Sequence, residues 1–159
     1  MLPPIVFASL ADGALNPAPI PGHWIIEGMP KAHARRLSAS ADGTSSTVAW
    51  SCTPGRFNWY YTVDETLYIV SGEVFVSDEK GGIRRLAAGD VAYFPAGSHS
   101  VWHVTDTVHK IAFCRHAMPR TFGLVLRAWN KLSRIFLGVP EAGGALEANP
   151  VDSAQATAA

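Results

Sequence analysis

Short runs of strand-forming residues alternate with turn sequences through residues 46–116. The runs are TVAWSC, FNWYYTV, TLYIV, EVFVSD, IRRL, VAYF, SVWHV and HKIAFC. Between them stand TPG, SG, EKGG, AAGD and PAGS, each with the glycine or proline that favours a turn. No helical period separates the runs. This pattern predicts an all-β fold, in which one antiparallel barrel or sandwich holds the whole region.

The segments on either side have different patterns. Residues 1–45 are rich in Pro, Ala, Gly and Ser, and we expect an N-terminal arm that lays a short strand on the main body. In residues 119–138 apolar side chains recur at steps of three and four, which predicts a C-terminal amphipathic α-helix ending at Gly138. Residues 139–159 are mostly small, and we expect a disordered tail.

The predicted helix is basic. Its charged residues are Arg120, Arg127, Lys131 and Arg134. A basic amphipathic helix can lie on a membrane surface or bind a partner. We favour packing on the end of the barrel or against a second subunit, because the helix also has a continuous apolar stripe. The stripe consists of Phe122, Leu126, Trp129, Leu132 and Phe136.

Composition narrows the class of protein. The chain has 159 residues, enough for one domain with a core. Its 13 basic and 13 acidic residues cancel, which disfavours nucleic acid as a partner. No apolar run approaches the roughly 18 residues that a membrane span needs, and the N-terminal sequence does not resemble a secretory signal. Cys52 and Cys114 have no CxxC spacing, so we expect two reduced, buried thiols in a cytoplasmic protein.

Two segments bounded by glycine hold the candidate chemistry. In the first, Glu65 is followed seven residues later by Gly72, and Glu65 shares one strand face with Leu67 and Ile69. A carboxylate on an apolar face is costly unless it is paired, hydrogen-bonded or bound to a metal. The second segment is Gly89, five residues, and then Pro95-Ala96-Gly97.

Together these segments resemble the two motifs of the cupin superfamily. More narrowly, WSCTPGRFNWYYTVDETLYIVSGEV and AAGDVAYFPAGS resemble the ureidoglycine aminohydrolase-type cupin domain subgroup (DUF861-like, Cupin_3). The resemblance covers roughly residues 45–115. It implies a double-stranded β-helix, or jelly-roll, barrel and, as in other cupins, a homodimer formed through edge strands and arms.

The chain departs from the cupin pattern at the metal ligands. The first motif's His-x-His pair falls on Trp59-x-Tyr61 or on Asn58-x-Tyr60, and the third histidine falls on Ser100. Only Glu65 remains of the usual ligand set, and one carboxylate is a poor transition-metal site. We therefore predict no cofactor and do not carry over the aminohydrolase activity.

A β-bulge would change this prediction. His99 lies one residue before the expected ligand position, and it shares the parity of His103. One extra residue after the Pro95-Ala96-Gly97 turn would reverse both side chains. The alternative is thus a divalent transition metal held by Glu65, His99 and His103.

Without a metal, the inward positions form an aromatic pocket for a small ligand with one polar or cationic group. Glu65 could act as general acid or base, with Tyr61 and Ser100 orienting the substrate or stabilising an oxyanion. Either Phe94 or Tyr93 should join the pocket. The predicted ligand-binding residues are Trp59, Trp102, Phe94 and Asn58.

Three functions remain open from the sequence. The first is a small-molecule enzyme, a hydrolase, lyase or isomerase, that is metal-free or weakly metal-dependent. The second is a non-catalytic module that binds or senses a small polar metabolite. The third is a structural dimer whose barrel is plugged by its own side chains, since small barrels fill their interiors. An open cavity would favour the first two, and a filled one would leave only the third.

Overall fold

The structure is a computed structural model that describes residues 4–117 together with Trp129 and Leu132. The chain divides into two compact units, residues 1–117 and 118–159. The predicted helix at 119–138, apart from those two residues, and the predicted tail at 139–159 lie outside the described residues. Within the described ranges, no helix has the length and apolar character needed to cross a membrane.

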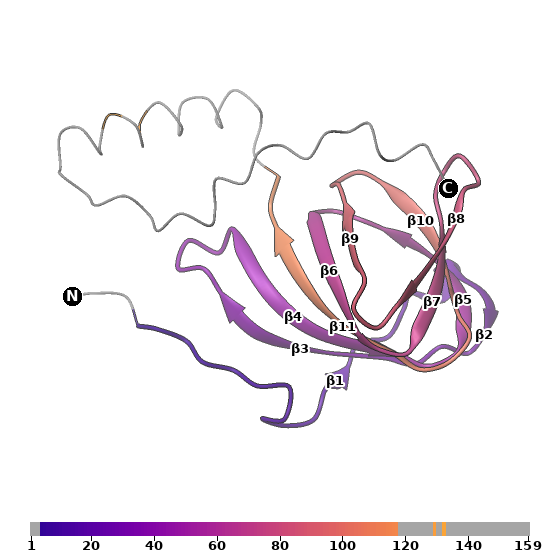
Figure 1. The fold of residues 1–159 in the computed structure, drawn as a ribbon, viewed down its shortest axis with the longest axis horizontal. Coiled ribbons are helices and arrows are strands. Elements are labelled where there is room, and N and C mark those ends of the chain that lie inside the picture. The colour runs from indigo at the N-terminus through magenta and orange to yellow at the C-terminus, as the bar shows by residue number, and fades with distance from the viewer. Residues whose placement is uncertain (1–3, 118–128, 130–131, 133–159) are drawn as a thin grey trace. The chain divides into compact units, whose positions relative to one another are not determined.

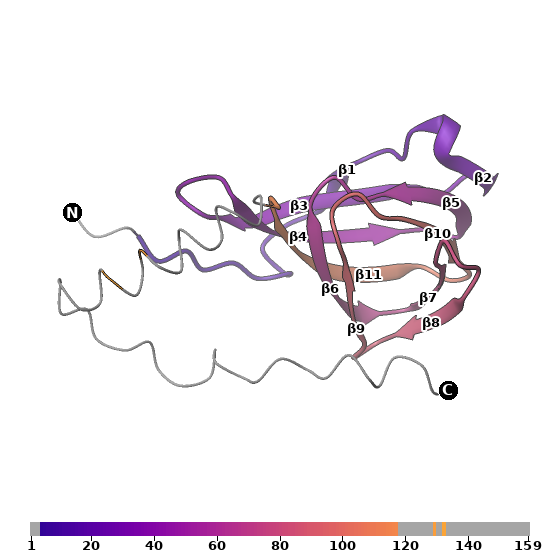
Figure 2. The same ribbon diagram turned by 90° about the horizontal axis from the view of Figure 1, so that it is seen from above.

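The first unit consists of two antiparallel sheets that face one another (Figures 1 and 2). The six-stranded sheet has the order β1-β3-β4-β11-β6-β9, and the five-stranded sheet has the order β2-β5-β10-β7-β8. The strands are β1 (Asn16–Pro17), β2 (Ile25–Gly28), β3 (Ala32–Ala39), β4 (Ser45–Cys52), β5 (Gly55–Tyr60), β6 (Asp64–Ser71), β7 (Glu73–Ser77), β8 (Ile83–Ala87), β9 (Val91–Phe94), β10 (His99–Val104) and β11 (Val108–Arg115), with a short 3-10 helix η1 (Gly22–Trp24) before β2.

The predicted all-β barrel is confirmed, and the eight predicted runs correspond to β4 through β11. Side chains alternate between the core and the outer surface along each strand. On β10, for example, Ser100, Trp102 and Val104 are buried between the sheets, whereas His103 is exposed. The largest fully buried side chains are Trp102 and Phe57, which come from neighbouring strands of the five-stranded sheet.

The segment that we expected as an N-terminal arm contributes three strands. β1 and β2 are short, but β3 pairs with β4 over its whole length. The inward residues of β3 begin with Ala32, which is 3% exposed. Alanine has low β-propensity, and it gave little periodic signal in the sequence.

Two motif glycines hold the turns that frame the site. Gly72, between β6 and β7, has φ of +75°, and a Cβ there would lie 2.1 Å from the backbone oxygen of Thr107. Only glycine fits that position. Gly97 also has a positive φ, and its N–H donates to the Tyr61 carbonyl oxygen at 2.7 Å. The Pro95–Gly97 turn is thereby tied to the start of the first motif.

Candidate functional site

A buried ion pair lies inside the barrel. The Lys110 Nζ on β11 is 2.5 Å from Oε1 of Glu65 on β6, and the two side chains are 3% and 9% exposed. The partner of Glu65 is therefore a lysine that our sequence reasoning missed. Lys110 has the same strand parity as the buried residues Val108 and Ala112, and that parity was the available signal.

Three indole rings surround the ammonium group of Lys110. Its Nζ lies 4.6 Å from the ring centroid of Trp102, 4.8 Å from that of Trp50 and 5.8 Å from that of Trp59. Cation–π attraction of this kind stabilises a desolvated ammonium group. Aromatic side chains thus fill the deep part of the barrel around the ion pair. The mouth of the barrel, in contrast, holds an open pocket.

A three-membered hydrogen-bond network lies next to the ion pair. The indole Nε1–H of Trp102 donates to the Tyr61 hydroxyl at 3.0 Å and to the Ser100 Oγ at 3.1 Å. The Tyr61 and Ser100 hydroxyls are 3.1 Å apart, and either one can donate to the other. Burial raises the pKa of Tyr61 well above its ordinary value, so its hydroxyl is neutral.

A pocket of about 430 Å³ opens where the edge strands β8 and β9 approach each other. We call it the mouth pocket. Its lining residues are Val76, Asp78, Gly82, Ile83, Arg84, Leu86, Ala92, Tyr93, Phe94, Pro95, Ser98, His99 and Ser100. The volume suits a small ligand. Two predicted inward residues, Ser100 and Phe94, line this pocket directly, and His99 of the alternative metal-ligand set also borders it.

The other inward residues lie behind these two. The Phe94 ring stacks on the Tyr61 ring at a centroid distance of 4.5 Å. Ser100 is hydrogen-bonded to both Tyr61 and Trp102, and the Trp102 ring contacts the Lys110 ammonium group. The structure thus brings the predicted inward residues together in one continuous cluster, with the ion pair at its deep end.

Asn58 and the two β10 histidines do not join this cluster. β10 keeps an unbroken register with β5, from His99 opposite Tyr60 to Val104 opposite Gly55. Without a bulge, His99 and His103 have the opposite parity to Ser100 and Trp102 and face away from Glu65. The Nε2–H of His99 donates to Oδ1 of Asn58 at 2.9 Å, and the His99 ring stacks on Tyr60.

The residues at the expected metal-ligand positions do not fit a transition metal. The carboxylate of Glu65 is already paired with an ammonium group, and the remaining positions hold indole and hydroxyl side chains. The set Glu65, His99 and His103 does not converge, because its histidines lie on the other side of β10. Among the described residues, no group of three or more His, Cys, Asp or Glu side chains could hold a metal ion.

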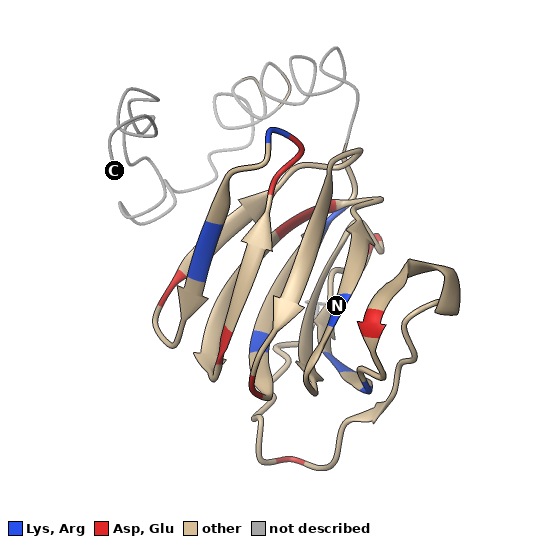
Figure 3. Cartoon of the chain, turned by 90° about the vertical axis from the view of Figure 1, so that its right-hand side faces the viewer, with Lys and Arg blue, Asp and Glu red and all other residues tan. Residues whose placement is uncertain are grey.

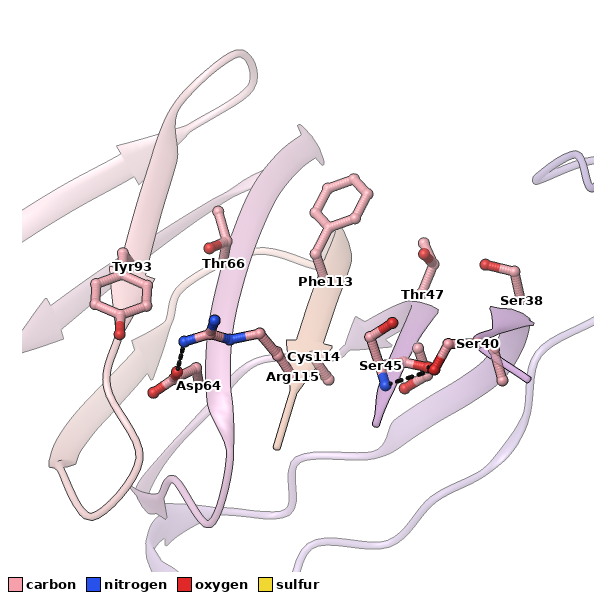
Figure 4. Close-up of a pocket in the computed structure, with 12 residues that line it drawn as sticks. Ser38, Ser40, Ser45, Thr47, Asp64, Thr66, Tyr93, Phe113, Cys114 and Arg115 are labelled. Carbon is pink, nitrogen blue, oxygen red and sulfur yellow. Dashed lines mark hydrogen bonds and ion pairs between the residues drawn. The ribbon is translucent and has the colours of Figure 1, made fainter. Parts of the chain in front are cut away.

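A second pocket, of about 420 Å³, lies on the outer face of the six-stranded sheet (Figure 4). Five side chains form a row across neighbouring strands there, in the order Ser38, Thr47, Phe113, Thr66 and Tyr93. Beside the row, Nη2 of Arg115 lies 2.8 Å from Oδ2 of Asp64. The backbone N–H of Ala96 and this arginine lower the pKa of Asp64. Tyr93 takes an outward position on β9, and both Tyr93 and Phe94 border the mouth pocket. Of the two, Phe94 reaches the interior cluster, where its ring stacks on Tyr61.

Comparison with known proteins agrees with this architecture. The model of the EutQ-like cupin domain family matches residues 39–112. A DUF861-family protein from Pseudomonas syringae pv. tomato is 22% identical, with a TM-score of 0.60 over 65% of this chain and 45% of that one. A cupin-like protein from Thermotoga maritima is 14% identical, with a TM-score of 0.54 over 67% of this chain and 81% of that one.

A second Thermotoga maritima protein, of the DUF861 family, is 36% identical over 40% of this chain and 73% of its own, with a TM-score of 0.39. No curated protein matches the chain. The matched residues 39–112 contain both glycine-bounded motifs and most of the strands described above. The match to the family model identifies residues 39–112 as a EutQ-like cupin domain.

Proposed function

We propose that this cupin-domain protein binds a small polar metabolite in the mouth pocket and recognises it through the hydroxyl of Ser100. One observation carries the proposal: the pocket reaches a hydroxyl pair in which only one of the two hydroxyl hydrogens is used by the hydrogen bond between the groups. The ligand would therefore present an acceptor oxygen to this end of the pocket.

The hydrogen count supports this reading. Tyr61 and Ser100 each carry one hydroxyl hydrogen, and a single hydrogen bond joins the two groups. The Trp102 N–H donates to both oxygens and accepts nothing. When Tyr61 donates to Ser100, the Ser100 hydroxyl hydrogen has no acceptor among the described residues and is free to bond a ligand in the pocket. A ligand oxygen at Ser100 would accept this hydrogen and complete the hydrogen bonding of the pair.

Binding without chemistry is the function that this site supports best. Glu65 is paired with Lys110, and the stacked rings of Phe94 and Tyr61 stand near it in the cluster. An enzymatic role for Glu65 as acid or base remains the second candidate, because Trp102 contacts both the hydroxyl network and the ammonium group. A ligand that displaced the Phe94 ring would gain access to the hydroxyl network and to Glu65 behind it.

The test of binding is calorimetric titration of the full chain with a panel of small amides, carboxylates and alcohols. We expect Ser100→Ala to weaken binding of the compounds that bind the native protein. Ser98→Ala is the matched control, because Ser98 also lines the mouth pocket but already donates its hydroxyl hydrogen to the Pro95 carbonyl oxygen at 2.6 Å. Equal loss in both variants, or binding by no compound, would contradict the proposal.

We also propose that the protein is a homodimer whose second copy packs on the outer face of the six-stranded sheet. Large apolar side chains are exposed on this face; Tyr68, Val91, Tyr93 and Phe113 are 41–63% exposed. The charged pair on the same face, Asp64 and Arg115, neutralises itself. Such a face is self-complementary, as a two-fold interface requires.

Sedimentation velocity tests this assembly. The native chain should sediment as a dimer, and Phe113→Asp should shift it toward monomer. The control is Ile83→Asp, which alters a residue 71% exposed on β8 of the other sheet. A monomeric native protein, or dissociation by the control alone, would refute this interface.

A further inference from the structure

The mouth pocket contains an arginine that the hydroxyl network does not explain. Arg84 on β8 pairs in register with Val76 on β7, and Leu86 pairs with Val74. Val76 and Leu86 are buried at 6% and 5% exposure. Residues that face each other across a sheet, or stand two apart on one strand, share a side. Arg84 therefore lies on the inward side of β8, at the open end of the barrel, where it lines the pocket.

The neighbouring arginine is arranged differently. Arg85 points to the opposite side of β8 and is paired with Glu73, at 2.6 Å between Nη2 and Oε2. Figure 3 shows a basic segment in blue on the strand that follows a turn with both basic and acidic residues. No ion pair joins Arg84 to a carboxylate in the part of the chain that the structure describes.

The acidic residue of the pocket is already engaged. Oδ1 of Asp78 accepts the backbone N–H groups of Lys80 and Gly82, at 2.9 and 2.8 Å. These bonds hold the carboxylate within its own turn. The pocket is left with an unpaired guanidinium group at one side and a spare hydroxyl hydrogen at the other.

We propose that the ligand of the mouth pocket is a small carboxylate with an apolar body. Its anionic group would lie between the Arg84 guanidinium and the Ser100 hydroxyl, and its body would pack on Leu86 and Phe94. This proposal rests on the proposed binding function and names its ligand class. A guanidinium group and a hydroxyl both donate, and charge-assisted bonds to a carboxylate are stronger than bonds to a neutral oxygen.

The strand register places Arg84 and Ser100 at a separation that one small ligand can bridge. Arg84, Val76 and Trp102 stand opposite one another on β8, β7 and β10, so Arg84 lies two strand spacings, about 10 Å, from β10. Ser100 is two residues, about 7 Å, further along that strand. A long arginine side chain and a small carboxylate together span this separation.

The experiment compares benzoate with benzamide, two probes of nearly the same shape that differ in charge. The full-length native protein should bind benzoate about tenfold more tightly than benzamide, measured by calorimetric titration. Arg84→Gln should remove this preference and leave benzamide binding unchanged. Arg85→Gln is the matched control, because it removes an arginine that points away from the pocket, and it should keep the preference.

The outcomes separate this proposal from the binding function on which it rests. Equal affinity of the native protein for the two probes, or a preference that survives in Arg84→Gln, would overturn the carboxylate assignment while binding itself stood. Binding of neither probe at millimolar concentration would count against both proposals. Because Arg84 is exposed, the Arg84→Gln variant should have the same Tm as the native protein. An unchanged Tm shows that a lost preference for benzoate does not come from a loss of folding.

Discussion

Lys110→Met should destabilise the fold more than any conservative change on the surface. The substitution removes the ammonium group and leaves the carboxylate of Glu65 unpaired among aromatic rings. An isolated buried charge is costly, whereas methionine keeps most of the lysine's apolar volume. The effect therefore isolates the charge.

The expected magnitude follows from the burial of the pair. Its side chains are 3% and 9% exposed, so bulk water screens them little. Breaking a buried ion pair by removing one partner costs about 3–5 kcal/mol. In a domain of roughly 100 residues, 1 kcal/mol changes Tm by about 4–8 °C. We expect Tm to fall by more than about 12 °C.

The assay is urea unfolding of the native chain, Lys110→Met, Glu65→Leu and the double variant. Replacing both partners by apolar side chains is often near neutral, so the double variant should be more stable than either single variant. The reasoning fails if Lys110→Met stays within about 1 kcal/mol of the native free energy of unfolding. It also fails if the two single effects simply add.

Three further predictions concern other parts of the fold. Gly72→Ala should lower the free energy of unfolding by about 2–4 kcal/mol, because its Cβ would meet the Thr107 backbone. Gly97→Ala, with open space around it, should lower it by only about 1–2 kcal/mol. Equal losses in the two variants would contradict this account. Because the pKa of Asp64 is lowered in the folded state, Asp64→Asn should lose stability above the ordinary carboxyl range. That difference should shrink as the pH falls through the lowered pKa, in melting curves from about pH 6 to about pH 2; a constant difference would argue against it. Burial raises the pKa of Cys52 to about 12, so alkylation at about pH 8 should modify this thiol only after unfolding, and rapid labelling of the native protein would disprove it.

Most strands could be predicted from the sequence, because short runs of β-branched and aromatic residues between glycine-containing turns strongly favour the strand conformation. β3 could not, since its small and polar residues acquire their strand conformation from pairing with β4. The parity of His99 follows from counting residues along a regular strand, and β10 pairs with β5 without a register shift.

The site was harder to predict than the strands. Glu65 required a partner on physical grounds, but nothing in the spacing showed that Lys110, 45 residues away, would supply it. That contact depends on β6 and β11 becoming neighbours in a sheet. The Trp102 hydrogen bonds depend on side-chain rotamers, which single-sequence patterns do not encode.

The indole cluster around Lys110 has a spectroscopic consequence. The Trp50 ring lies 5.9 Å from the rings of both Trp59 and Trp102, in edge-on geometry. Indole transition dipoles held so close together couple as excitons and produce a circular dichroism couplet of their own. Its bands overlap those of the peptide groups in the far ultraviolet. The ellipticity of this protein therefore reports the packing of its barrel interior as well as its strands, and a change at Lys110 would alter the spectrum without altering a single backbone hydrogen bond.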